Sequence, residues 1–263
     1  MELQAILDWY DADQRRDAVN HGTRREVTGT VVRYVAMHEP RGYVTYSQLA
    51  ADTADEAIRR EVDYFERLGQ AFEWTAYSHD SPPDLRERLL RHGFEAEETE
   101  AIMILEVDAL GAEPAPPPSP EVRRIRDPGT LADVFKSRHG DAANTEHGLS
   151  LTRRLQRELQ EIPDRLSVYV AYCDGVPACS GWIRFDPVSP FASLWGGATR
   201  PEFRMRGLYT ALVAARAQEA RERGARFLTV DAQSMSRPIL EKRGFRPLTL
   251  ATPMMWRPPP PVG

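Results

Sequence analysis

The sequence predicts an α/β protein built from two tandem units of similar design. Three observations support this: segments with strand and helix periodicity alternate, a proline-rich segment divides the chain, and glycine–phenylalanine signals recur in both halves. The 263 residues, 41% of them hydrophobic, suffice for two ordinary domains. We therefore expect domains at 1–110 and 121–257, a linker at 111–120 with five prolines, and a proline-rich tail at 258–263.

The first half predicts helices joined to strands. An amphipathic helix is expected at 2–19, because Ile6 and Tyr10 recur at helical spacing. The further elements expected are strands at 27–36, 43–49, 72–77 and 101–107, a helix at 53–68, and a short helix around 85–90.

The second half predicts a longer series of elements. In order, we expect a strand at 122–125, helices at 128–138 and 144–160, strands at 167–173, 177–185 and 191–199, a helix from 208 to about 223, a strand at 226–231, a helix at 236–243 and a strand at 245–256.

Composition and charge limit the classes of partner. No apolar run approaches the roughly 20 residues of a membrane span, and the start of the chain lacks the regions of a signal peptide. A formal net charge of −5 argues against a general nucleic-acid binder. We predict a cytoplasmic protein without membrane or nucleic-acid partners; the oligomeric state stays open.

The two cysteines flank a predicted hairpin turn at Asp174-Gly175. In that hairpin Cys173 lies opposite Val176 and Cys179 opposite Val170, so the thiols do not face each other as a disulfide requires. Their spacing also differs from that of metal-binding cysteines. We expect two reduced thiols and no metal site.

The segment 194–215 reads as strand, tight loop and helix. Arg204, Arg206 and Gly207 lie where the helix should begin, so unpaired backbone N–H groups, the positive helix end and two cations converge there. A phosphate group suits such a place.

The two halves match in the spacing of their glycine signals. Gly69-Gln70-Ala71-Phe72 corresponds to Gly224-Ala225-Arg226-Phe227, and a Gly-Phe pair ends a short helix in each half. This alignment places Asp52 opposite Gly207, where a carboxylate would repel an anion. We expect the first half to be a duplicated unit that kept the fold and lost the site; the alternative is a general likeness among α/β units.

The second half resembles the GCN5-related N-acetyltransferases (GNAT). Their pyrophosphate loop reads R/Q-x-x-G-x-G/A after a strand ending V-x-P, and Arg204 and Gly207 match it. Thr199 replaces the usual valine, and Tyr209 replaces the usual Gly or Ala. The resemblance covers 122–256 and, more loosely, 2–107. It implies an acyl-CoA N-acyltransferase-like α+β fold in tandem, each unit a mixed, mostly antiparallel sheet flanked by helices, the first degenerate.

The resemblance also implies an acetyl-CoA-dependent N-acetyltransferase that acetylates a primary amine, in a small molecule or peptide, by direct attack in a ternary complex. Backbone groups of Ala198 and Thr199 would pair with the pantetheine arm, and an N–H near Ala198 would stabilise the oxyanion. The residues expected to cradle the pyrophosphate are Arg204, Met205, Arg206, Gly207, Leu208, Tyr209 and Thr210.

The residues leave several candidates for the groups that donate and accept protons. Many relatives carry a tyrosine acid four residues before the Gly-Phe pair, where this sequence has Leu240. Ser234, Ser236 or water could substitute, or the thiolate leaves without an acid. Asp231 is expected either as the base or as a turn cap.

Some nearby residues are weaker candidates. His139, Glu146 and His147 lie in or beside a loop that faces the acceptor in the resembling fold. Trp195 is expected in the acetyl pocket or in the core. Arg216, Arg221 and Arg223 read as a solvated helix face.

Two other classes of function remain to compare. A non-catalytic acyl-CoA sensor or interaction module would share the loop, and Leu240 in the tyrosine position favours it. A nucleotide-binding domain is disfavoured, because no G-x-G-x-x-G or G-x-x-x-x-G-K-S/T run is present.

Overall fold

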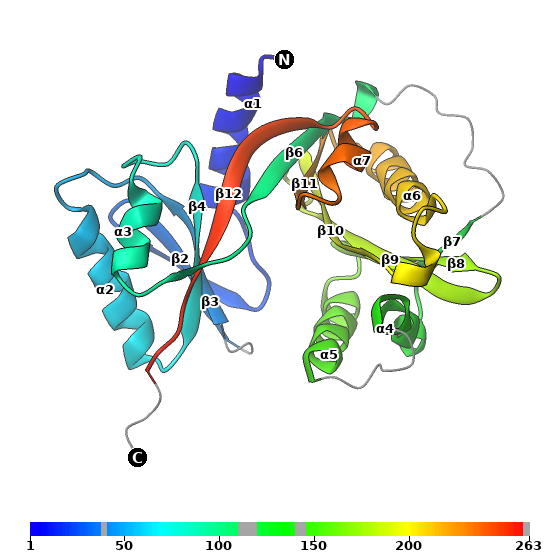
Figure 1. Ribbon diagram of the computed structural model, residues 1–263, viewed down its shortest axis with the longest axis horizontal. Helices are drawn as coiled ribbons and strands as arrows, with labels where there is room; N and C mark the ends of the chain where they lie inside the picture. The colour runs from blue at the N-terminus through cyan, green and yellow to red at the C-terminus, as the bar shows by residue number, and fades with distance from the viewer. Residues whose placement is uncertain (38–40, 110–119, 140–145, 260–263) are drawn as a thin grey trace. The chain divides into compact units, whose positions relative to one another are not determined.

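The structure is a computed structural model that describes residues 1–37, 41–109, 120–139 and 146–259 (Figure 1). The chain divides into two compact units. Unit 1 comprises Met1–Ile102, Ala232–Arg237 and Pro247–Gly263, and unit 2 comprises Met103–Asp231 and Pro238–Arg246. Each unit combines parallel and antiparallel strand pairs with helices, which is the predicted α/β class.

Unit 1 is a mixed sheet covered by helices α2 (Ala54–Arg67) and α3 (Leu85–Arg91). Only the pair β3–β4 is parallel, and the other pairings recorded in this unit are antiparallel. In sheet order, the strands are β1 (Thr23–Thr28), β2 (Val31–Ala36), β3 (Arg41–Ser47), β4 (Ala71–Tyr77) and β12 (Arg246–Trp256), with β5 (Glu95–Ala96) on β12.

The sequence predicted most elements of unit 1 but passed over the two-residue strand β5, and two expected elements differ in the structure. The strand expected at 27–36 is two strands, because Gly29 at φ +61° makes a turn between β1 and β2. The helix expected at 2–19 consists of α1 (Leu3–Tyr10) and the π-helix η1 (Asp11–Arg16).

The C-terminal strand lies in a different unit from the one expected. The sequence assigned it to the second domain, whereas β12 pairs with β4 in unit 1, Met254 opposite Trp74. Met254 and Trp256 are buried in the core of this unit, and the Trp256 ring lies 5.7 Å from that of Phe72. The burial of these side chains against unit 1 explains the pairing. The expected linker at 111–120 lies almost wholly outside the described residues.

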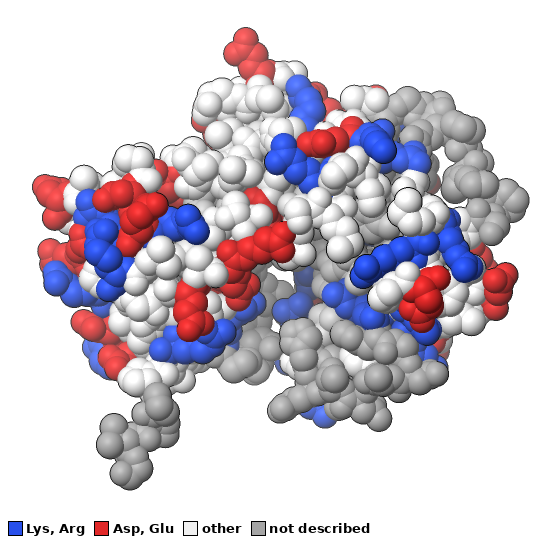
Figure 2. All heavy atoms as spheres, in the orientation of Figure 1, with Lys and Arg blue, Asp and Glu red and all other residues white. Residues whose placement is uncertain are grey.

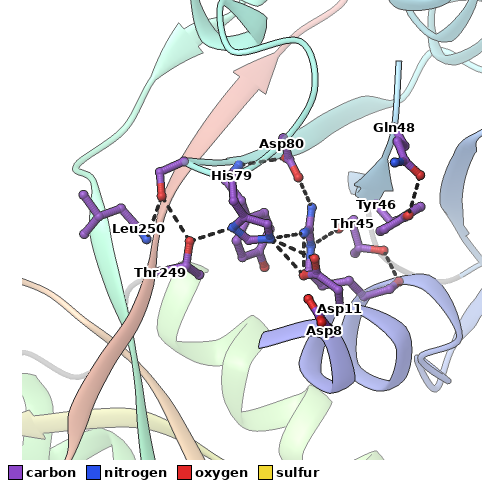
Figure 3. A network of polar contacts seen from close by, with 12 residues as sticks. Asp8, Asp11, Thr45, Tyr46, Gln48, His79, Asp80, Thr249 and Leu250 are labelled. Carbon is purple, nitrogen blue, oxygen red and sulfur yellow. Dashed lines mark hydrogen bonds and ion pairs between the residues drawn. The ribbon is translucent and has the colours of Figure 1, made fainter. Parts of the chain in front are cut away.

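A buried polar network fixes the N-terminal helices to the sheet of unit 1 (Figure 3). Arg15, with 1% of its side chain exposed, pairs with Asp80 at 2.6 Å and with Asp11 at 2.6 Å. His79 lies between Asp11, 2.9 Å from Nε2, and Thr249 on β12, 2.8 Å from Nδ1 (Figure 3). These contacts join η1, the segment after β4, and β12.

Unit 2 has a strand arrangement similar to that of unit 1. Its sheet order is β6 (Glu100–Glu106), whose last four residues belong to this unit, then β11 (Phe227–Ala232), β10 (Phe191–Thr199), β9 (Val176–Phe185), β8 (Leu166–Cys173) and β7 (Glu121–Ile125). As in unit 1, one recorded pair, β10–β11, is parallel. Helix α6 (Leu208–Glu222) covers one face, and α4 (Ala132–His139) and α5 (Glu146–Glu161) cover the other (Figure 1).

The helix endings show why the glycine signals repeat. Gly69 and Gly224 follow the long helices α2 and α6, and Gly93 and Gly244 follow the short helices α3 and α7 (Arg237–Glu241). All four have φ between +63° and +85°, a left-handed conformation that glycine adopts without strain. The sequence repeat therefore corresponds to a repeat of backbone structure.

The hairpin of β8 and β9 corrects one expected register. Cys173 lies opposite Val176 as expected, but Cys179 lies opposite Ala171 rather than Val170. The register shifts between Ala171 and the next residue, which displaces the partner of Cys179 by one position. Both thiols are free.

Candidate functional site

Strands β10 and β11 separate part-way along unit 2. Their recorded parallel pairs run from Phe191 opposite Phe227 to Leu194 opposite Val230, although both strands continue. Strand β10 stays paired with β9 as far as Thr199. The edge of β10 beyond Leu194 therefore offers backbone groups to a ligand.

A glycine bulge lies at this separation. The β9–β10 register shifts between Trp195 and Ala198, so that Gly196 and Gly197 together face one residue of β9. Gly196 has φ +62°, and a Cβ there would lie 2.0 Å from the Trp182 ring. Only glycine fits this position without displacing the buried tryptophan.

The backbone direction after the bulge identifies the exposed N–H group. The Arg200 N–H donates to the Ala178 carbonyl at 3.0 Å, and alternation in an antiparallel ladder then directs the Thr199 N–H and carbonyl away from β9. The Thr199 carbonyl accepts a hydrogen bond from Arg204 Nε at 3.4 Å. Thr199, next to the expected Ala198, is thus the residue whose N–H points to the open edge.

The start of helix α6 has features that suit an anion. Its N-cap is Gly207 at φ +75°, no side chain caps it, and a Cβ there would meet nothing within 4 Å. Open space therefore adjoins Gly207, and the first N–H groups of the helix have no partner within the helix. The short helix η4 (Pro201–Phe203) and the exposed side chains of Arg204, Met205 and Arg206 precede it. Figure 2 shows cationic atoms around the segment that leads into α6.

Tyr209 turns towards the bulge. A Cβ on Gly197 would lie 2.6 Å from Cε2 of Tyr209, so this ring packs directly over the glycine. Burial raises the pKa of the Tyr209 phenol. The departure from the loop pattern at this position is accommodated by Gly197. Of the other expected loop residues, Leu208 is buried and Thr210 is half-buried.

The corresponding helix start in unit 1 differs in charge and conformation. The N-cap of α2 is Thr53 at φ −113°, and Asp55 and Glu56 occupy its first turn. Asp55 pairs with His92 at 3.0 Å and with Arg88. Carboxylates thus occupy the positive end of this helix, which leaves it unsuited to a second anion.

The expected catalytic residues fall into both units. Asp231 is exposed and lies in unit 2, one residue beyond the last recorded β10–β11 pair. Ser234 and Ser236 lie in unit 1, where Ser234 donates to Glu98 at 3.1 Å and Ser236 donates to the Gln233 carbonyl at 3.2 Å.

The remaining candidates have distinct positions. Leu240, in the tyrosine position, is fully buried, and Trp195 is 43% exposed rather than part of the core. His139 ends α4 and Glu146 and His147 begin α5, but their side chains lie outside the described part of the chain.

Sequence reasoning was wrong about Arg216 and passed over Arg138. Arg216 does not lie on a solvated face: it is 1% exposed and donates from Nη1 to the carbonyls of Trp182 and Trp195, at 3.1 and 3.4 Å. Arg138 donates to the Gly196 carbonyl at 2.5 Å. One signal was present, since Arg216 follows Leu212 by four residues on the apolar stripe of α6.

The described residues form neither a metal-binding cluster nor a membrane-spanning helix. Within the described ranges, no group of three or more His, Cys, Asp or Glu side chains is arranged to hold a metal ion. No helix there is long and apolar enough to cross a membrane.

Comparison with known families decides the relationship of the second half. Residues 135–245 match a family model described as the acetyltransferase (GNAT) family. This segment belongs to the GNAT acetyltransferases. The match includes β10, the loop before α6 and the Gly-Phe pair at Gly244-Phe245. No curated protein sequence gives a match.

Solved structures extend the fold to the whole chain. A GCN5-related N-acetyltransferase from Kribbella flavida is similar with a TM-score of 0.68 and 17% identity, covering 99% of this chain and 95% of that one. A tandem GNAT protein from the clavulanic acid biosynthesis pathway has a TM-score of 0.64 and 15% identity, covering 97% and 88%. A GCN5-related N-acetyltransferase from Sphaerobacter thermophilus has a TM-score of 0.57 and 15% identity, covering 99% and 92%. The chain therefore has the tandem GNAT fold.

Proposed function

We propose that the protein is an acetyl-CoA-dependent N-acetyltransferase that acetylates a primary amine of a small molecule or peptide. Unit 2 binds acetyl-CoA, and the first half is a degenerate copy of the same fold that does not bind it. The observation that carries this proposal is the start of α6: a left-handed Gly207 without a side-chain cap, open space beside it, and two exposed arginines in the loop.

The loop and the separated strand fit two parts of one substrate. The loop from Arg204 to Thr210 holds the pyrophosphate through the N–H groups from Met205 onward, because the Arg204 N–H donates to the Pro201 carbonyl at 3.2 Å. The Thr199 N–H, on the edge of β10 that faces away from β9, pairs with the pantetheine arm as a further strand would. In acetyl-CoA the thioester provides the acyl group that is transferred. An N–H aimed at the developing oxyanion contributes roughly 3–4 kcal/mol in characterised enzymes.

The reaction proceeds by direct attack in a ternary complex. The amine nitrogen forms a bond to the thioester carbon, and the electron pair of the carbonyl moves to oxygen. The carbon–sulfur bond then breaks, its electron pair leaves with sulfur, and the nitrogen loses a proton. Asp231 takes that proton directly or through water; its exposure and its place one residue beyond the last recorded β10–β11 pair support this role.

A protein acid for the leaving sulfur is not needed in this proposal. Leu240 is buried where a tyrosine would be expected, and the Ser234 hydroxyl already donates to Glu98. Ser234 or Ser236 remain alternative donors, as does water.

Coenzyme A binding tests the cradle. Gly207→Glu introduces a carboxylate where the pyrophosphate should lie, and calorimetry should show at least a hundredfold loss of affinity for coenzyme A. Gly224→Glu is the matched control, because Gly224 also has φ +75° and open space but follows the other end of α6. Equal affinities for the two variants would place the phosphate elsewhere.

A non-catalytic acyl-CoA sensor is the second candidate, favoured by the buried Leu240. Thioester consumption measured across a panel of primary amines separates the two. The enzyme reading expects turnover that depends on the amine. Coenzyme A binding together with turnover that no amine accelerates would support the sensor.

A further inference from the structure

Two arginines hold the bulge of β10 from opposite faces of the sheet. Arg216 comes from α6 and donates to the Trp195 carbonyl, and Arg138 comes from α4 and donates to the next carbonyl, that of Gly196. Figure 1 places α6 and α4 on opposite faces of β9 and β10. Two cationic groups therefore converge on consecutive peptides at the separation of β10 from β11.

The surrounding structure is shaped around Arg216. A Cβ on Gly181 would lie 2.8 Å from Arg216 Nη1, so glycine leaves room for the guanidinium beneath the sheet. Its Nε also donates to the Leu212 carbonyl at 3.1 Å. The side chain is thus held by three carbonyl groups and has little freedom to move away.

Neither guanidinium has a carboxylate partner among the described residues. Their recorded hydrogen bonds end on carbonyl oxygens, and burial without an opposing carboxylate lowers the pKa of both Arg138 and Arg216. The ionisable groups that act on the pKa of Arg216 are Tyr209, Cys179 and Tyr169, whose own pKa values are all raised by burial. These groups are neutral at pH 7, so they do not balance the charge.

Uncompensated buried charge is costly, and buried cations are normally paired. A neutral amide side chain could satisfy the same carbonyl groups at lower cost. Two cations on adjacent peptides also repel each other. The arrangement becomes favourable when negative charge forms nearby, which is what acyl transfer produces on oxygen and then on sulfur.

We propose that Arg216 and Arg138 are positioning residues that fix the Trp195–Gly197 bulge and supply the positive charge that favours the departing thiolate, in place of a tyrosine acid. This inference rests on the proposed function. The arginines act through the peptides they hold and through their charge.

The first measurement requires no turnover. Coenzyme A is titrated on the full-length protein, and the ultraviolet absorbance of its thiolate reports the pKa of the bound thiol. In the wild-type protein this pKa should lie at least about one unit below that of free coenzyme A, a tenfold shift in the thiolate equilibrium. Arg216→Gln should abolish most of the shift, whereas Arg216→Lys, which keeps the charge, should retain it.

The second measurement is kinetic. Arg216→Gln and Arg138→Gln should each lower kcat by about 10–100-fold, within the range for removal of a single electrostatic contribution. The affinity for coenzyme A should change less than threefold, because the cradle before α6 is separate. Arg153→Gln, the same substitution at an exposed position of α5, is the control and should leave both unchanged.

The outcomes separate the two proposals. Failure of the wild-type protein to bind coenzyme A would overturn the proposed function and this inference with it. Binding with an unshifted thiol, or an equal loss of the shift in Arg216→Gln and Arg216→Lys, would overturn the inference alone. A parallel loss of affinity and folding in both variants would show that Arg216 is merely structural.

Discussion

Substitution of Gly196 by alanine tests whether the bulge is determined by the packing of Trp182. Gly196 has φ +62°, and its added Cβ would lie 2.0 Å from Cζ3 of Trp182, a side chain that is 4% exposed. The left-handed backbone costs alanine about 1–2 kcal/mol. Displacing a buried ring adds about 1–3 kcal/mol. We expect Gly196→Ala to lower the free energy of unfolding by about 2–5 kcal/mol in total.

The control separates the two contributions. Gly224 has φ +75° with nothing within 4 Å of its Cβ position, so Gly224→Ala should lose only the backbone contribution of about 1–2 kcal/mol. Both glycines belong to unit 2, which makes their urea denaturation curves, followed by circular dichroism, directly comparable. Equal destabilisation by the two substitutions would refute the steric argument, as would wild-type stability in Gly196→Ala.

Three further predictions concern the rest of the chain. Arg15→Met should lower the free energy of unfolding by about 3–5 kcal/mol, because it leaves the buried Asp80 carboxylate without its ion-pair partner. Adding Asp80→Asn should recover part of that loss in urea denaturation, and a loss below about 1 kcal/mol for Arg15→Met would contradict this. Burial raises the pKa of Glu100, so its ionisation destabilises the fold as pH rises above 4.5. The Glu100→Gln variant should therefore be more stable than the wild-type protein at pH 7 but not at pH 3. An equal difference in stability at both pH values would exclude this linkage. Because acidic residues occupy the first turn of α2, calorimetry should find one coenzyme A per chain, and two would restore a site to the first half.

The order of elements could be read from the sequence because local signals determine it. Alternating and helical periodicities identified the strands and helices around α2 and α6, and glycines with positive φ marked where helices end. Gly207 was found because it stands with two arginines where a helical pattern begins, and these residues are contiguous in the chain.

What the sequence alone determined was therefore the fold class, the repeat and the glycine-containing loop before α6, each encoded within a few neighbouring residues. The partner of β12 depended on tertiary structure, since burial of Met254 against unit 1 involves residues far apart in the chain. The burial of Arg216 also depended on tertiary structure. Its charge suggested an exposed position on the helix, but Gly181 leaves room for the guanidinium and carbonyl groups of β9 and β10 accept its hydrogen bonds. Local periodicity determines which element forms, whereas contacts between distant segments decide which polar groups are buried away from water and so have altered charge energetics.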